Sequence, residues 1–440
     1  MEYLSDGITD SLINSLSEIK RLRVVARSLA FRYKGREVDP QSAGRELGVR
    51  AVLAGRVLLR GDTLVIGTEL LNVDTGSQIW GAQYRRKFED IFAIEEEVAR
   101  EISEKLRLQL SGEEKKRLTK RATQNKEAYQ LYLKALYFLN RGPEEHQKAV
   151  EYVRQAIDAD PGSAPSYAVL AHAYGTLGFF NYVPAAEAFP KAKAAALKAL
   201  ELDERLPDAH ASLAMTRLFY DWDWAGTDKE IRRALELNPD HPLSLVAHGY
   251  YLLFQGRLQE ALAEAKRALD LDPLSFLANH FLGAALLAAS EYGRAVDQFR
   301  KTVELNPNLP TRSLLVMAYA LQGRHEEAMA ACQTLSALPR GSVPSRVLMG
   351  YCYALAGKVE EARSILEELN NLPEKGSIAT YYTAILHAAL HEPDPSFELL
   401  NKLCDERFGF VLGIKCFPFL DPLSSDPRFG DLLRRVGLPQ

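Results

Sequence analysis

The stretch Leu243–Pro273, LSLVAHGYYLLFQGRLQEALAEAKRALDLDP, decides the fold of most of this chain. Apolar residues recur at intervals of three and four on both sides of Gly256, which is typical of two amphipathic helices joined by a short turn. Gly249 and Ala261 place one small residue on each helix, so the two backbones can approach each other closely. Pro273 ends the second helix because it has no amide donor. The stretch therefore predicts a helical hairpin.

The same pattern returns at a fixed period along the chain. The segments ALELNP, ALDLDP and TVELNP end at Pro239, Pro273 and Pro307, which are 34 residues apart. The turn glycines Gly323 and Gly357 have the same spacing. One hairpin cannot bury its apolar face alone, so neighbouring hairpins must stack into a solenoid.

This period and its small residues resemble the tetratricopeptide repeat (TPR). The small position of the first helix falls on Ala171, Ala214, Gly249, Gly283, Val316 and Gly350, and that of the second helix on Ala261, Ala295, Ala328 and Ala362. The resemblance implies a right-handed α-solenoid of seven or eight repeats over residues 126–407. Residues 408–440 are then expected to form a C-terminal capping tail.

Residues 1–87 follow a different pattern. The opening MEYLSDGITDSLINSL has a helical apolar stripe, Leu22–Ala26 is predicted as a short strand, and a helix is expected between the N-cap Asp39 and Gly48. Three β-rich runs follow within residues 49–86. The order α-β-α-β-β-β predicts a small α/β domain with its helices on one face, so the whole chain is expected to be α+β. Residues 88–125 predict an amphipathic helix and a polar linker.

The segments YLSDGITDSLINSL, LRVVARSLAFRYKG and IWGAQYRRKFEDIFAIEEEVA resemble the TolB amino-terminal-like domain. Members of that family begin with an apolar strand that this sequence lacks, so the resemblance implies a partial domain with an open sheet edge beside Leu22–Ala26. In bacterial proteins this domain often precedes TPR repeats, behind a winged-helix DNA-binding domain of the CadC type, a serine/threonine kinase or a nucleotide cyclase. The resemblance thus implies a role in bacterial signalling or transcription regulation.

Composition excludes several classes of protein. The net charge of −4 over 440 residues is too small to steer the whole molecule toward nucleic acid or an anionic membrane. There is no apolar run of about 18 residues and no signal-peptide pattern, so we expect a cytoplasmic protein, or an extracytoplasmic one if a longer chain carries a membrane span upstream. Four cysteines without a C-x-x-C pair favour a reduced compartment.

Motifs of catalysis are not found in the sequence. It contains no phosphate-binding loop, no nucleophile elbow and no H-E-x-x-H pair, so we predict a non-enzymatic protein with no catalytic residue, cofactor or metal. His387 and His391 lie four residues apart on a predicted helix, but two ligands do not close a metal site. Cys332 and Cys352 occupy repeat positions that normally pack, which indicates small core residues.

Two local features allow alternative interpretations. The run Lys20–Arg36 holds seven basic residues, no acid, and Phe31 with Tyr33 between them. It could bind phosphates and stack bases, which makes a nucleic-acid-binding regulator the alternative function, or it could be a charged edge that resists strand pairing. Trp222 and Trp224 could bind a ligand, but we favour a packing role. In that role they fill the gap between two helices whose turn lacks its glycine.

The main hypothesis places function on the concave surface of the solenoid. First-helix residues predicted to line it are apolar or aromatic, namely Met215, Leu218, Val246, Tyr250, Leu253, His280, Leu287, Met317, Val347 and Tyr351. Such a groove suits a helix or an extended apolar peptide, so we predict a scaffold with a protein or peptide partner. The competing possibility is that several of these residues only pack between helices. The oligomeric state is not predicted.

Overall fold

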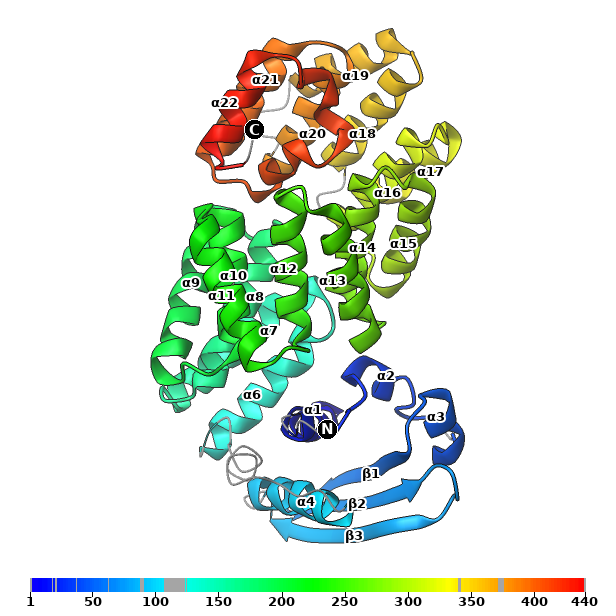
Figure 1. Ribbon diagram of the computed structural model, residues 1–440, viewed down its shortest axis with the longest axis vertical. Helices are drawn as coiled ribbons and strands as arrows, with labels where there is room; N and C mark the ends of the chain where they lie inside the picture. The colour runs from blue at the N-terminus through cyan, green and yellow to red at the C-terminus, as the bar shows by residue number, and fades with distance from the viewer. Residues whose placement is uncertain are drawn as a thin grey trace. The chain divides into compact units, whose positions relative to one another are not determined.

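A computed structural model describes residues 2–17, 19, 22–36, 38–61, 63–87, 91–106, 123, 125–338, 342–370 and 376–438. The chain forms two compact units, which are coloured along the sequence in Figure 1. Unit 1 comprises residues 1–141 and 148–169, and unit 2 comprises residues 142–147 and 170–440. Each unit is described by itself.

Unit 1 combines a small sheet with several helices. Its elements up to the end of the sheet are α1 (Glu2–Ser17), α2 (Arg27–Phe31), α3 (Pro40–Glu46), β1 (Ala51–Arg60), β2 (Thr63–Asn72) and β3 (Gln78–Lys87). They are followed by α4 (Ile91–Lys105), α6 (Lys126–Leu139) and most of α7 (His146–Ala159). The predicted linker between α4 and α6 lies outside the described residues, except at Thr123 and Asn125.

The sheet is antiparallel, in the order β1-β2-β3, with Val57 opposite Ile66 and Ile66 opposite Tyr84. Side chains of a strand alternate between its two faces, so one face of the sheet is apolar. That face supplies Leu64, Ile66, Leu70, Trp80 and Tyr84 to a core that also contains the apolar stripes of α1 (Leu4, Ile8, Leu12, Leu16) and α4 (Ile94, Val98, Ile102). The amphipathic patterns of both helices are therefore confirmed.

The predicted strand at Leu22–Ala26 is wrong. These residues are irregular and join no strand, although Leu22 and Val24 pack against the core. The Leu22 amide donates to the Ile19 carbonyl at 2.9 Å. In the part of unit 1 that the structure describes, β1 and β3 are both sheet edges, so the predicted open edge is not formed by a strand at Leu22–Ala26.

The first helix pair of the predicted repeat array packs with the N-terminal elements. Helix α1 contacts α6, and a Cβ built at Gly7 would lie 2.6 Å from Cδ2 of Leu133. Only a glycine allows the two helices to come this close. The division between the compact units therefore falls inside the array predicted from residue 126.

Unit 2 is a series of stacked helix pairs (Figure 1). After η2 (Pro143–Glu145), the paired helices are α8 (Ala164–Phe179), α9 (Ala185–Leu202), α10 (Pro207–Thr216), α11 (Trp224–Leu237), α12 (Pro242–Phe254), α13 (Leu258–Leu271), α14 (Phe276–Ala288), α15 (Tyr292–Leu305), α16 (Leu309–Leu321), α17 (His325–Ser336), α18 (Ser342–Leu355), α19 (Val359–Asn370), α20 (Gly376–Ala389) and α21 (Pro393–Asp405). From α10 onward, each first helix contacts its own partner and the next first helix. The predicted α-solenoid is confirmed.

The repeat positions have the structural roles that their residue types predict. Gly256, Gly323 and Gly357 end first helices with φ between +75° and +77°, a conformation that favours glycine. A Cβ built at Gly249 would overlap the Phe281 ring, and one at Gly283 would lie 2.5 Å from Cε1 of Phe299. Close packing of helices thus requires these glycines.

The C-terminal segment folds against the first helices. It contains η4 (Gly409–Lys415), η5 (Pro418–Leu423) and α22 (Pro427–Arg435), in red in Figure 1. Helix α12 contacts η4 and α20 contacts η5. The Phe410 ring lies 6.0 Å from Phe179 and 6.1 Å from Tyr381, and Cys416 Sγ donates to the Leu253 carbonyl at 3.3 Å. The segment therefore fills space on the face where we predicted a groove.

Candidate functional site: an aromatic cavity in unit 2

The ten predicted groove residues are all buried, with at most 9% of each exposed, and lie on α10, η3 (Arg217–Asp221), α12, α14, α16 and α18. Tyr250 is enclosed by Phe179, Phe219 and Phe281, with ring centroids 4.5–5.6 Å away. In this structure the ten side chains pack between helices and against the C-terminal segment, so they do not form an open apolar groove. Their role in binding a partner stays a prediction.

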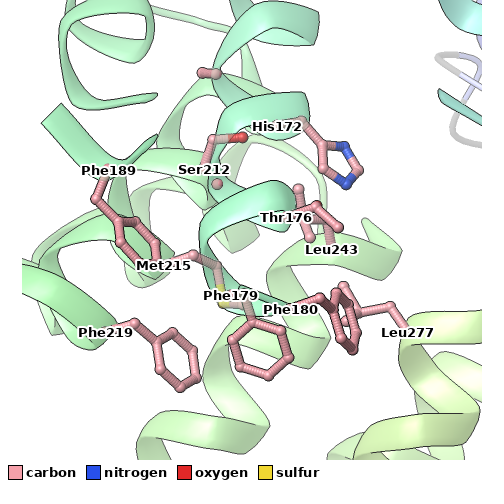
Figure 2. A pocket seen from close by; sticks show the side chains of 12 residues that line it. His172, Thr176, Phe179, Phe180, Phe189, Ser212, Met215, Phe219, Leu243 and Leu277 are labelled. Carbon is pink, nitrogen blue, oxygen red and sulfur yellow. The ribbon is translucent and has the colours of Figure 1, made fainter. Parts of the chain in front are cut away.

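A small cavity of about 20 Å³, which is room for about one water molecule, lies beside this core and opens to solvent. Its wall combines residues from five helices and one turn: Ala171, His172, Gly175, Thr176, Phe179 and Phe180 of α8, Phe189 of α9, Ser212 and Met215 of α10, Phe219 of η3, Leu243 of α12 and Leu277 of α14. Figure 2 shows four phenylalanine rings gathered at the cavity. Met215 is the predicted groove residue that lines it.

Two departures from the repeat pattern build the aromatic wall. The long turn after Phe179 and Phe180 separates α8 from α9, and Phe189 enters from the first turns of α9. At the end of α10 the chain forms a single π-type turn, η3, whose Phe219 ring lies 4.8 Å from Phe179 at 73°. Such turns insert a residue into a helix and redirect its side chains. The irregular repeats thus supply the ring cluster.

The polar groups of the wall carry no charge. Ser212 is only 4% exposed, and its hydroxyl has no hydrogen-bond partner within the part of the chain that the structure describes. Burial lowers the pKa of His172 below its usual value, so its imidazole is neutral at pH 7. Lys, Arg, Asp and Glu do not occur among the residues that line the cavity.

Sequence reasoning identified Met215 but missed the other cavity residues. The one available signal was the segment FFNYVPAAE, which lengthens a turn of the second repeat and begins with Phe179 and Phe180. It did not reveal that Phe219, far along the chain, would meet these rings. That contact depends on how successive helix pairs stack.

Two basic residues of the run Lys20–Arg36 neutralise carboxylates of α1. Arg27 forms an ion pair with Asp10, and Lys34 forms one with Asp6. Both carboxylates are only 5% exposed, and buried charges require such partners. The Arg27 guanidinium also lies 3.9 Å from the centroid of the Phe31 ring. Arg27 and Lys34 therefore stabilise the fold, which argues against the nucleic-acid interpretation. Lys20 and Arg21 lie outside the described residues.

Trp222 and Trp224 have structural contacts. Trp222 takes the left-handed conformation, with φ of +57°, where other repeats have a turn glycine, and the guanidinium of Arg407 lies 4.3 Å from its ring. Trp224 Nε1 donates to the Val436 carbonyl at 3.0 Å. These contacts favour the predicted packing role.

The remaining candidate sites do not assemble. His391 lies beyond the end of α20 with φ of +57°, so the prediction that it shares a helix with His387 is wrong; His387 Nδ1 instead bonds Glu392 at 2.9 Å. Cys332 and Cys352 are buried core residues, as predicted. Among the described residues, no three His, Cys, Asp or Glu side chains group as metal ligands, and no helix is both long and apolar enough to cross a membrane.

Family models for the tetratricopeptide repeat match residues 246–310 and 309–334. The chain is 34% identical over 216 residues to "Putative adenylate cyclase 3" of Rhizobium meliloti, and 27% identical over 213 residues to the transcriptional regulator HilA of Salmonella typhimurium. These alignments cover 48% and 47% of this chain, but only 37% and 38% of the relatives' own lengths.

A solved structure of a monomeric IFIT1 mutant with m7Gppp-AAAA shares the fold with a TM-score of 0.51 at 15% identity. The similarity covers 80% of this chain and 79% of that one. At this identity, the likeness concerns the fold alone. With the family models and the stacked helix pairs of unit 2, it leads to one conclusion: the chain carries tetratricopeptide repeats.

Proposed function

We propose that this chain is a non-enzymatic protein-interaction module of a bacterial signalling or transcription-regulatory system, and that unit 2 binds a protein or peptide partner. The observation that carries the proposal is the series of stacked helix pairs in unit 2, part of which matches the family models for the tetratricopeptide repeat. Stacked repeats present extended surfaces with which proteins of this architecture bind their partners.

The two curated relatives support the regulatory context. One is named as a cyclase and the other as a transcriptional regulator, and each is similar to about half of this chain. Proteins with different named activities can share a module that serves both without carrying out either activity. The resemblance of residues 1–87 to a TolB-like domain remains part of the proposal, as a second module in the same kind of protein.

The test is an unbiased selection of displayed peptides on the whole purified chain, followed by calorimetry with the selected peptides. We expect peptides that bind with saturable, one-to-one stoichiometry. A chain that selects no peptide above background would contradict the proposal. Cyclase or nucleotide-hydrolysing turnover by the purified chain would show instead that it is an enzyme.

Nucleic-acid binding is the second candidate, because Arg23 and Arg36 of the basic run are exposed. If it were correct, affinity for duplex DNA would fall steeply with salt, since each phosphate contact releases counterions. The double variant Arg23→Glu/Arg36→Glu would then lose binding. We expect neither effect, because Arg27 and Lys34 already neutralise Asp10 and Asp6.

A further inference from the structure

The face of the sheet in unit 1 that points away from the core carries a basic cluster. Side chains alternate between the two faces of a strand, so this face is opposite the one that supplies Leu64, Ile66 and Tyr84 to the core. We call it the outer face. The strand register arranges it in four rows that run from β1 through β2 to β3, namely Arg60/Thr63/Lys87, Leu58/Val65/Arg85, Arg56/Gly67/Gln83 and Ala54/Glu69/Gly81.

Four cations lie on the outer face. Arg56, Arg60, Arg85 and Lys87 are exposed, and none of the four forms an ion pair within the parts of unit 1 that the structure describes. Glu69 is the one acid in the four rows, and it lies in the last of them. Like charges that are close together on a sheet destabilise it, so an anionic ligand would relieve their repulsion.

The middle strand of the outer face carries shorter side chains than its two neighbours. β2 contributes Thr63, Val65 and Gly67, and a Cβ built on Gly67 meets nothing within 4 Å. β1 and β3 place the long basic side chains on either side of this strip. An extended chain can therefore lie along β2 between two rows of cations.

An acidic peptide matches this arrangement. Alternate residues are about 7 Å apart both in a strand and in an extended peptide, so carboxylates of such a peptide can follow the spacing of Arg85 and Lys87. A guanidinium group binds a carboxylate through two parallel hydrogen bonds. Leu58 is 40% exposed and shares a row with Val65, which provides a contact for one apolar side chain of the peptide.

Two other anionic partners match the outer face less well. Single-stranded nucleic acid is bound by basic surfaces with aromatic rings on which bases stack, and the four rows contain no aromatic residue. A membrane is bound through a broad apolar face that enters the lipid, whereas Leu58 is the one exposed large apolar residue of the rows. The charges and side-chain sizes thus favour an acidic peptide.

We propose that the outer face binds an extended acidic segment of a partner protein. Its carboxylates pair with Arg56, Arg60, Arg85 and Lys87, and an apolar side chain of the segment packs against Leu58. This inference goes beyond the proposed function, because it adds a binding surface on unit 1 to the one proposed for unit 2.

The experiment uses the whole chain and an acetylated, amidated hexapeptide of five glutamates with leucine at its third position. Binding is followed by NMR chemical shifts and by hydrogen exchange of the three strands. We expect saturable binding that weakens as salt is added, because exposed ion pairs are screened. The matched peptide with glutamine in place of glutamate should bind at least tenfold more weakly.

Two adjacent residues provide a matched pair of variants. Arg85→Glu should weaken binding of the hexapeptide roughly fivefold or more, because an ion pair is replaced by a repulsion. Arg86→Glu makes the same change of charge at an exposed neighbour whose side chain points to the opposite face, and it should change the affinity less than about twofold.

A third variant keeps every charge. Gly67→Val places a branched side chain in the strip between the cations, where no atom lies within 4 Å of the added Cβ, and valine favours a strand. It should weaken binding of the hexapeptide because the peptide backbone can no longer lie along β2. If Arg85→Glu does not fold by circular dichroism, Gly67→Val decides the question.

Several results would overturn the proposal: the hexapeptide does not bind, Arg85→Glu and Arg86→Glu weaken it equally, or Gly67→Val binds it as the parent chain does. Oligothymidylate, duplex DNA and vesicles of phosphatidylserine and phosphatidylcholine are tested alongside. If one of them binds more tightly than the hexapeptide and Arg85→Glu weakens that binding, the outer face is a phosphate-binding surface instead.

The outcome separates this proposal from the proposed function. Selected peptides that bind Arg85→Glu and Gly67→Val as they bind the parent chain would support unit 2 as the binding module, whatever the hexapeptide does. If every selected peptide loses affinity in both variants, the outer face is supported while peptide binding by unit 2 is contradicted.

Discussion

Gly249 and Gly175 are both glycines inside first helices of unit 2, but their surroundings differ. The Phe281 ring covers the Cα of Gly249, so that a methyl group there would overlap it, whereas the space beside Gly175 is open. Sequence pattern predicted the role of Gly249 through its repeat position. Gly175 is not one of the recurring positions of the repeat, so the sequence pattern predicted no role for it. Its surroundings come from helices that lie elsewhere in the sequence.

We therefore predict opposite effects of one substitution at these two positions. Gly249→Ala should lower the free energy of unfolding by roughly 1–3 kcal/mol, because the methyl group overpacks the helix interface. Gly175→Ala should raise it by about 0.5–1 kcal/mol, because alanine favours the helix and meets no neighbour. Urea unfolding followed by circular dichroism measures both, and a shift in the same direction for the two variants would refute the assignment.

The environment of Asp10 leads to a second prediction at the scale of the residue. It faces Asp6, Arg27 and Asn140; burial raises its pKa to about 6 and Asp6 adds to the rise, against the opposing effect of Arg27. A carboxyl whose pKa is higher in the folded state stabilises the fold when protonated. Its contribution is fully present below the unfolded value of 3.8 and is lost as the pH rises through about 6.

Asp10→Asn should remove this pH dependence from unit 1. Between pH 4 and pH 7, the difference in unfolding free energy between the parent chain and the variant should change by roughly 2.5 kcal/mol, which is most of the effect of a shift of about two pKa units. Hydrogen exchange of α1 peptides, corrected for intrinsic exchange rates, measures it. Equal pH profiles for the two proteins would show that Asp10 does not titrate in this range.

At the scale of the element, the pair α10–α11 shows how an irregular repeat is held together. Its turn is the π-type η3 and ends at Trp222 in a left-handed conformation. Glu230 of α11 is buried; it bonds His210 Nδ1 of α10 at 2.6 Å and lies 3.6 Å from Arg217 of η3. His210 Nε2 also faces the Glu204 carbonyl at 2.9 Å. Buried ionic contacts thus link the two helices where the usual glycine turn is missing.

Glu230→Ala should destabilise this pair by about 3 kcal/mol, because it removes the carboxylate that bonds the buried His210 and leaves Arg217 with Asp223 alone. The matched control is Glu236→Ala on the same helix, whose exposed ion pair with Arg233 contributes at most about 1 kcal/mol. Hydrogen exchange of α10 and α11 peptides should accelerate only in the first variant. Similar exchange in both variants would contradict a structural role for the buried contacts.

At the scale of the whole molecule, the C-terminal segment belongs to the core of unit 2. Val411, Leu412, Ile414 and Leu420 are buried, and they belong to the same core cluster as Tyr250 and Tyr351. The segment was predicted as a cap, and it also contacts the first helices α12 and α20. The segment thus adds to the burial of the predicted groove residue Tyr351, whose ring centroid lies 6.5 Å from that of Phe419.

Deletion of residues 408–440 should therefore expose apolar surface on α12 and α20. We expect faster hydrogen exchange in both helices and strong binding of an apolar fluorescent dye. Arg434→Ala is a suitable control, because its side chain is exposed and pairs with the exposed Asp431. Unchanged exchange in α12 and α20 after the deletion would show that the segment is not needed for their packing.

The sequence by itself determined the helix pairs, their 34-residue period, the glycines and prolines that end them, and the amphipathic helices that cover the sheet. These are local properties, because apolar spacing and special backbone conformations depend on residues that are close together in the sequence. The tertiary structure decided that Leu22–Ala26 is not a strand, that Arg27 and Lys34 neutralise buried carboxylates, and that the predicted groove is filled. It also assembled the aromatic cavity, because that depends on which side chains from distant repeats meet when the solenoid stacks.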